Sequence, residues 1–113
     1  MRLRAFLLAG SLFGAVAMAG CGGALARGES QFDEGRYPDA KNTFASIEGE
    51  SHAYGDARRA EYALYRGLTL NALGDRDQAG VWLREAKAIE DAHPGSLTGE
   101  QVQRLRLATN SGE

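Results

Sequence analysis

The sequence predicts an all-α fold in which two antiparallel helical hairpins are followed by a C-terminal capping helix. Apolar residues recur at steps of three and four, which is the period of one helix face. Glycines stand where helices should end, because glycine adopts the left-handed conformation at low cost. One segment also repeats another at an offset of 39 residues, which is typical of helical repeat proteins. We expect this domain to span residues 24–109.

Residues 1–20 read as a targeting segment that precedes the domain. Arg2 and Arg4 give a positive front end, and residues 5–19 carry no charge. The apolar run is too short for a typical spanning helix, and its flanks are typical of a cleaved signal peptide. We therefore expect residues 1–20 to be a signal peptide.

The segment Ala17–Cys21 resembles the lipobox of bacterial lipoproteins, in which small residues lead directly into a cysteine. The resemblance implies that Cys21 becomes the first mature residue and the lipid attachment site, with residues 21–23 as the lipidated tether. Gly22 follows that cysteine, which favours the outer membrane in the enteric sorting pattern, with the domain facing the periplasm. The alternatives are an ordinary secretory signal with an incidental cysteine, or a short uncleaved membrane anchor.

The first predicted hairpin begins with a helix over residues 24–34. Gly35 should end this helix, and Pro38 suits the first position of the next one. We expect a loop over residues 48–55, because that stretch is polar and contains glycine. The apolar positions of the two helices are Leu25, Gly28, Phe32, Ala40, Phe44 and Ile47.

The second predicted hairpin contains two longer helices that meet at Gly74. Asp56 is the expected N-cap of its first helix, and its second helix should end near Ala92. Gly67 lies in the middle of the first of these helices, where glycine costs about 1 kcal/mol and so suggests a close packing contact. We expect that contact to be with Ala79.

The last predicted helix has a strong local start signal. Thr98 and Gln101 have the spacing of a capping box, and Leu97 and Val102 that of a hydrophobic staple. A narrow apolar stripe suits a helix that caps the array, and residues 110–113 are expected to be a tail. The stripe consists of Val102, Leu105 and Ala108.

Six of the 17 residues in segment 24–40 are identical to their counterparts at the offset of 39. The alternative to an internal repeat is chance similarity between two helices rich in alanine and glycine. The identical residues are Ala24, Leu25, Arg27, Gly28, Gly35 and Ala40, which fall on Ala63, Leu64, Arg66, Gly67, Gly74 and Ala79.

The repeated pattern resembles the tetratricopeptide repeat (TPR) family. Its motif places a small residue inside the first helix, a glycine near the turn, and then aromatic and alanine positions in the second helix. Leu83 replaces one of those aromatic residues in the second copy, and Arg76 replaces the other. The matching residues are Gly28, Gly35, Tyr37, Ala40 and Phe44 in the first copy, and Gly67, Gly74, Ala79 and Ala86 in the second.

The TPR resemblance implies a concave face, lined by the first helix of each hairpin, that takes a segment of a partner protein. Glu29 and Glu61 are also expected on this face. We therefore expect a membrane-anchored interaction module or assembly scaffold of the bacterial envelope; the alternative is a passive structural lipoprotein whose helices serve as a spacer. An apolar groove left open by the last helix would favour the first reading. The predicted partner-binding residues are Leu25, Phe32, Leu64, Leu68 and Asn71.

Charge and composition argue against nucleic-acid binding and against catalysis. Loss of Arg2 and Arg4 would leave 11 basic and 15 acidic residues in the 93 residues after position 20, a net charge of −4. Nucleic acid is therefore not an expected partner. The expected partner is an envelope protein of unspecified identity, or a second copy of this chain. The single cysteine and the loop histidines His52 and His93 offer no catalytic set, so we expect no enzyme, no cofactor and no metal site.

Overall fold

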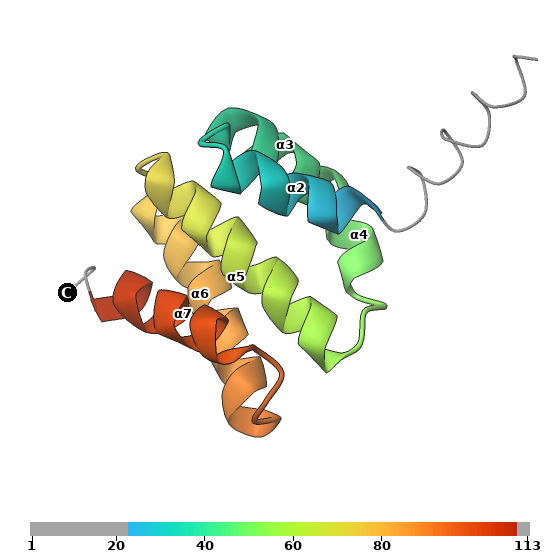
Figure 1. Ribbon diagram of the computed structural model, residues 1–113, viewed down its shortest axis with the longest axis vertical. Coiled ribbons are helices and arrows are strands. Elements are labelled where there is room, and N and C mark those ends of the chain that lie inside the picture. The colour runs from blue at the N-terminus through green and yellow to red at the C-terminus, as the bar shows by residue number, and fades with distance from the viewer. Residues whose placement is uncertain (1–22, 111–113) are drawn as a thin grey trace, which may run out of the picture.

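The computed structural model describes residues 23–110, and these fold into six helices with no strand among them (Figure 1). The all-α prediction is confirmed. The predicted signal peptide, Cys21 and residues 111–113 lie outside the described residues. The helices are α2 (Gly23–Asp33), α3 (Tyr37–Ser46), α4 (Glu48–Ser51), α5 (Asp56–Ala72), α6 (Arg76–Ala92) and α7 (Gly99–Asn110).

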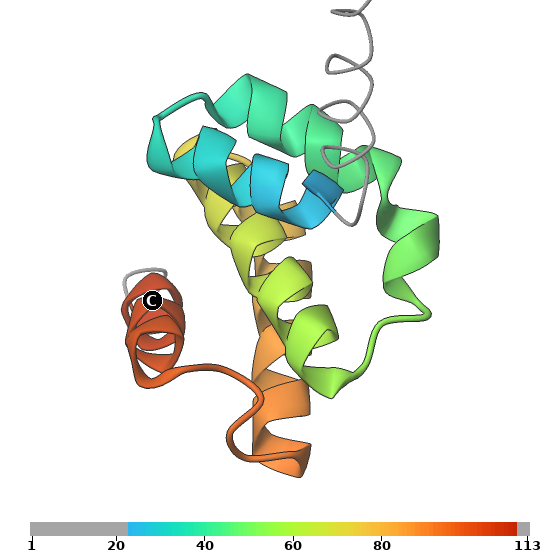
Figure 2. The same cartoon turned by 45° about the vertical axis from the view of Figure 1, so that its right-hand side comes forward.

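The helices form two layers. Helices α2 and α3 make one hairpin and α5 and α6 a second, longer one, while α7 follows alone (Figure 1). The first helix of each pair and α7 lie on one side, with α3 and α6 behind them (Figure 1). α7 contacts both α5 and α6, yet stands well away from α2 (Figure 2). None of the helices within residues 23–110 is long and apolar enough to cross a membrane.

The two hairpin turns have the same geometry. Gly35 and Gly74 both adopt positive φ, at 79° and 87°, as the sequence predicts. In each turn the next residue, Arg36 or Asp75, donates its backbone N–H to the carbonyl five positions earlier, at 2.8 and 2.9 Å. This is the hydrogen bond of a Schellman motif, which satisfies a free carbonyl at the helix end. Asp75 then caps α6 by accepting from the backbone N–H of Gln78 at 3.2 Å.

A glycine brings the helices of each hairpin close together. A Cβ atom placed on Gly28 would lie 2.5 Å from the ring of Phe44, and one on Gly67 would lie 2.7 Å from Leu83. The two contacts occupy equivalent positions at the offset of 39. The predicted pairing of Gly67 with Ala79 was therefore one helical turn short, since Leu83 is the nearest neighbour. Helix crossing sets this register, and it cannot be read from the spacing of small residues alone.

The segment between the hairpins is more ordered than predicted. Part of the expected loop 48–55 forms the short helix α4. The hydroxyl of Ser51 donates to the carbonyl of Glu48 at 2.6 Å, and Ser51 is buried, so tertiary packing stabilises this single turn. Asp56 is the first residue of α5 rather than its N-cap, because Gly55 occupies the cap position with an extended backbone.

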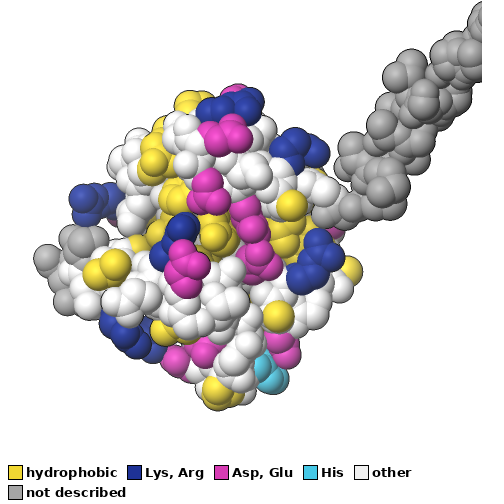
Figure 3. All heavy atoms as spheres, viewed as in Figure 1, with side chains coloured by type: hydrophobic (Ala, Val, Ile, Leu, Met, Phe, Trp, Pro, Cys, Tyr) yellow, Lys and Arg dark blue, Asp and Glu magenta, His cyan; other side chains and the backbone are white. Residues whose placement is uncertain are grey.

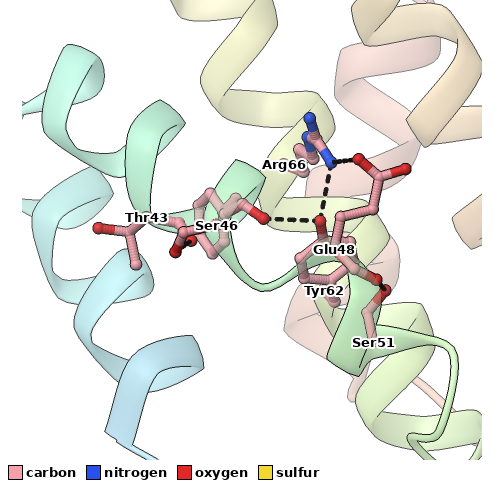
Figure 4. A network of polar contacts seen from close by, with 7 residues as sticks. Thr43, Ser46, Glu48, Ser51, Tyr62 and Arg66 are labelled. Carbon is pink, nitrogen blue, oxygen red and sulfur yellow. Dashed lines mark hydrogen bonds and ion pairs between the residues drawn. The ribbon is translucent and has the colours of Figure 1, made fainter.

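A polar network joins α3, α4 and α5 (Figure 4). The buried hydroxyl of Tyr62 donates to the carbonyl of Phe44 at 2.7 Å. Arg66 donates to Tyr62 at 2.8 Å and to Glu48 at 2.9 Å. Its guanidinium also lies 4.5 Å from the centre of the Trp82 ring on α6. Trp82 therefore packs between the layers, while the network fixes α3 and α4 against the second hairpin.

Helix α7 begins at the predicted capping box. Thr98 accepts from the backbone N–H of Gln101 at 3.2 Å, and Gln101 accepts from that of Thr98 at 2.9 Å. The helix continues to Asn110, which was expected to begin the tail. Leu105 is the buried residue of α7, and Val102 and Ala108 are partly buried and pack against the core.

Candidate functional site

A shallow groove of about 540 Å³ separates α7 from the C-terminal end of α2. Helix α5 forms its floor, and Figure 2 shows α7 standing opposite α2. The space-filling view of this side shows hydrophobic side chains at its centre, with acidic and basic groups around them (Figure 3). The lining residues are Phe32, Asp33, Tyr37, Leu68, Arg104, Leu107 and Ala108.

The groove is apolar at its base because aromatic rings gather there. The ring of Phe32 lies 5.4 Å from that of Tyr37 and 5.7 Å, edge-on, from that of Tyr65. Such tilted and edge-on pairs are the favoured aromatic geometries. Leu68 is partly exposed beside them, and Leu107 on the opposite wall is 60% exposed. A partner side chain can therefore remove apolar surface from water without moving the core.

Arg104 forms an ionic bridge across the groove. Its guanidinium lies 3.7 Å from Asp33 on α2 and 3.4 Å from Glu100 on α7. It also lies 5.8 Å from the centre of the Tyr65 ring. Ion pairs as exposed as these contribute little to stability, so Arg104 is available to exchange partners when a ligand enters.

A pair of carboxyl groups lies further along the same side of the molecule. Glu29 on α2 hydrogen-bonds with Glu61 on α5 when it is protonated. Among the described residues no donor reaches Oε2 of Glu29, although that atom is shielded from solvent. Burial raises the pKa of Glu29 from 4.5 to about 9; the contact with Glu61 and the charge of Asp33 act in the same direction, and Arg58 opposes them. Glu29 therefore holds a proton at neutral pH.

The carboxyl pair borders a second hollow of about 370 Å³ between α2 and α5. A carboxyl without a donor in a partly shielded place is an unfavourable arrangement unless a proton or a cation accompanies it. Arg58 lines the same hollow, and its positive charge opposes the rise in the pKa of Glu29. The residues that line this hollow are Leu25, Ala26, Glu29, Arg58 and Glu61.

A third hollow, of about 420 Å³, lies between α6 and α7 and contains Asn71. Arg76, Asp77 and Arg84 make it strongly polar. Asn71 therefore does not line the apolar groove with Leu68, although both lie on α5. The two hollows share Ala108 on α7 and so adjoin each other.

Apart from Asn71, the predicted partner-binding residues fall into two groups in the structure. Leu25 and Leu64 are core residues with 4% and 0% of their surface exposed, so they cannot contact a partner in this conformation. The TPR resemblance placed them on the concave face, whereas the neighbouring helices bury both side chains. Phe32 and Leu68 line the groove, and for them partner binding stays a prediction. The lipid-attachment residue Cys21 lies outside the described residues.

Sequence reasoning did not identify the wall that α7 contributes. Arg104 and Leu107 share one face of α7 because they are three residues apart. Their spacing was visible in the sequence, but the direction of that face depends on how α7 docks on α5 and α6. The contact between Glu29 and Glu61 joins two helices and has no local sequence signal.

The surface of the described residues is hollowed in several places. Within residues 23–110 no group of three or more His, Cys, Asp or Glu side chains is placed to hold a metal ion. His52 and His93 are both exposed, and Nδ1 of His93 lies 3.5 Å from Asp56. The groove combines an apolar base with charged edges, a combination that is common in ligand pockets and protein interfaces.

Comparisons of the chain with protein-family models, curated proteins and solved structures found no match. The function of the chain must therefore be inferred from the groove and from the sequence signals. Fold class alone does not identify a function.

Proposed function

We propose that this chain is a TPR-like lipoprotein, held on a bacterial envelope membrane through Cys21, whose groove binds a segment of a partner envelope protein. The observation that carries the proposal is the open groove between α2 and α7. α7 borders this groove instead of filling it, so the apolar surface of Phe32 and Leu68 stays partly accessible. A spacer has no need of such a surface.

The TPR-like part of the proposal is supported by the equivalence of the two hairpins. Gly28 faces Phe44 as Gly67 faces Leu83, and both turns use the same Schellman hydrogen bond. In a repeat array, corresponding contacts recur in each unit. The first helix of each hairpin then lies on the side that carries the groove (Figure 1).

The anchoring part rests on the sequence alone. Cys21 follows small residues and an uncharged segment, and α2 begins two residues later at Gly23. A lipid on Cys21 would therefore hold the domain close to the bilayer surface. A diacylated and N-acylated cysteine gives stable anchoring, because several acyl chains insert together.

Site-specific photo-crosslinking in native envelopes tests the binding proposal. A photoreactive residue at position 107 lies on the groove wall, and one at position 81 on α6 is a matched control, since Leu107 and Val81 are 60% and 47% exposed. We expect position 107 to crosslink to a discrete protein that position 81 does not reach. When the chain is purified from the same envelopes without a photoreactive residue, Leu107→Glu should no longer co-purify with that protein, whereas Val81→Glu should.

Three results would contradict the proposal. Equal crosslinking from both positions would mean that the groove has no selective occupant. Unchanged capture by Leu107→Glu would place the binding surface elsewhere, and an envelope in which neither position crosslinks would favour the spacer reading.

A further inference from the structure

We propose that α7 is a movable wall of the groove, which detaches from α5 and α6 and returns by pivoting at Leu97 while α2 to α6 stay folded. The groove then has a closed form, which is the one described above, and an open form that a partner segment can enter. The opening belongs to the fold and can be measured without a partner. Its use in recognition rests on the proposed function.

Helix α7 buries less apolar surface than the other long helices. In α5 eight of the 17 residues are buried, whereas in α7 Leu105 alone is buried and Val102 and Ala108 are partly buried. In a domain, a helix is stable mainly through the apolar face that it packs against its neighbours. Helix α7 should therefore detach at a lower free-energy cost than unfolding of the whole domain.

Three surface hollows adjoin α7 along its length. The groove of about 540 Å³ lies toward α2, a hollow of about 420 Å³ lies toward the N-terminal half of α6, and one of about 270 Å³ lies toward the C-terminal half of α6. The first two share Ala108, and the last two share Thr109. Side chains that border open space have no packing partner on that side. Helix α7 thus has few contacts to lose when it moves.

An exposed ion pair ties α7 to α2 across the groove. Nη1 of Arg104 lies 3.7 Å from Oδ1 of Asp33, and both side chains are accessible to solvent. Ion pairs of this kind contribute little to stability, because water and salt screen them. The pair can therefore break and re-form as α7 moves, while Arg104 keeps its contact with Glu100 on its own helix.

The start of α7 is held more firmly than the rest of the helix. Leu97 is buried, and its backbone N–H donates to the carboxylate of Glu90 at 2.8 Å. Thr98 and Gln101 form the capping box with each other, so this first turn needs no contact with α5. These contacts persist when the following turns detach, which places the pivot at Leu97.

Opening would join the groove and the two other hollows beside α7 into one trough over α5 and α6. A segment that enters the trough would be enclosed between Leu68 on α5 and Leu107 on α7 when the wall returns. Its apolar side chains would then lose more contact with water than on the shallow closed surface. The movement therefore gives a shallow groove a way to hold a polypeptide segment firmly.

Hydrogen exchange of the full chain in detergent micelles, resolved to single residues by mass spectrometry, tests the opening. A helix of 12 residues is marginally stable without tertiary packing, so its amides exchange when α7 detaches. The amides of residues 103–110 should share one protection factor, about 100-fold or more below the highest factor in α5. Low urea should reduce protection in α5 and leave α7 unchanged, since local opening exposes little surface.

Substitutions separate local opening from global unfolding. Tyr62→Phe removes a contact between α3 and α5 that the open form keeps, so protection should fall about tenfold in α5 and stay unchanged in α7. Leu105→Ala weakens the closed form and should lower protection in both helices. Leu107→Ala, the same change on an exposed side of α7, should alter neither. If Tyr62→Phe leaves α5 unchanged, Phe44→Leu in the buried contact with Gly28 takes its place.

Two results would overturn the inference. Equal protection in α5 and α7, with an equal fall in both caused by Tyr62→Phe, would mean that α7 detaches only when the whole domain unfolds. Protection that declines steadily toward Asn110 would indicate fraying of the helix end. Either result leaves the proposed function intact, whereas absence of crosslinks from position 107 would remove the proposed function and leave the opening in place.

Discussion

Substitution of Gly67 by alanine should destabilise the domain even though alanine is the better helix former. A Cβ atom at this position would lie 2.7 Å from Cδ2 and Cγ of Leu83 and 3.2 Å from its backbone nitrogen. Leu83 is buried, so its side chain has little room to move aside. Because the added Cβ would also press on the α6 backbone, helices α5 and α6 must move slightly apart.

Two opposing free-energy terms set the change in stability. Replacing a helical glycine by alanine contributes about 1 kcal/mol of stability, whereas overpacking a core contact costs about 1–3 kcal/mol. For Gly67→Ala we expect a net loss of about 1 kcal/mol. Gly80 is the matched control, because it also lies inside a helix but its added Cβ would meet only the flexible end of Arg84, at 3.2 Å. Gly80→Ala should therefore gain up to about 1 kcal/mol.

Thermal unfolding followed by circular dichroism measures both variants. One kcal/mol corresponds to about 4–8 °C for a domain of this size. Gly67→Ala should melt below the wild type and Gly80→Ala above it. Shortening the opposing side chain in Gly67→Ala/Leu83→Ala should recover part of the packing strain in a double-mutant cycle. Equal gains from Gly67→Ala and Gly80→Ala would refute the close contact between α5 and α6.

Three further predictions concern the anchor, the carboxyl pair and the buried network. Cys21→Ser should abolish metabolic labelling by palmitate, and equal labelling of both proteins would exclude lipid attachment at Cys21. The pKa of Glu29 is higher in the folded than in the unfolded state. The contribution of Glu29 to the free energy of unfolding is therefore complete below pH 4.5 and declines as the pH rises to about 9. Glu29→Gln should therefore gain stability over the wild type with rising pH, by about 1–2 kcal/mol at pH 8 after allowance for solvent screening; the exposed control Glu50→Gln should show no such trend in urea titrations. Tyr62→Phe removes the hydroxyl that donates to the Phe44 carbonyl and accepts from Arg66, and it should cost about 1–2 kcal/mol in the same assay. An unchanged midpoint would mean that water replaces the hydroxyl.

The parts of the fold that could be predicted are those with local signals. Gly35 and Gly74 end helices because their backbone conformation disfavours other residues, and this requirement acts within a few positions. Thr98 and Gln101 begin α7 through hydrogen bonds between near neighbours. Such features need no knowledge of the rest of the chain.

The errors arose where distant segments decide the outcome. Segment 48–55 is polar and was expected to be a loop, but the contact between Glu48 and Arg66 helps to hold α4 in place. Leu64 was placed on a binding face by the TPR resemblance, which does not show what covers a given side chain, and Leu64 is fully buried. The proximity of Glu29 and Glu61 depends on the packing of α2 on α5, which no short-range pattern encodes.

The isolated position of α7 has a consequence for how this protein can diversify. The floor of the groove and its α2 wall belong to the packed hairpins, where a substitution disturbs many neighbours. The α7 wall is held by Leu105 and two partly buried side chains, Val102 and Ala108. It is also held by the connection at Glu90, whose carboxylate accepts the backbone N–H groups of Gly95 and Leu97 at 3.0 and 2.8 Å. Residues such as Leu107 can therefore vary in size and charge at little cost to folding. If the groove binds a partner as proposed, substitutions on this one helix can change which segment it accepts while the rest of the fold stays unchanged.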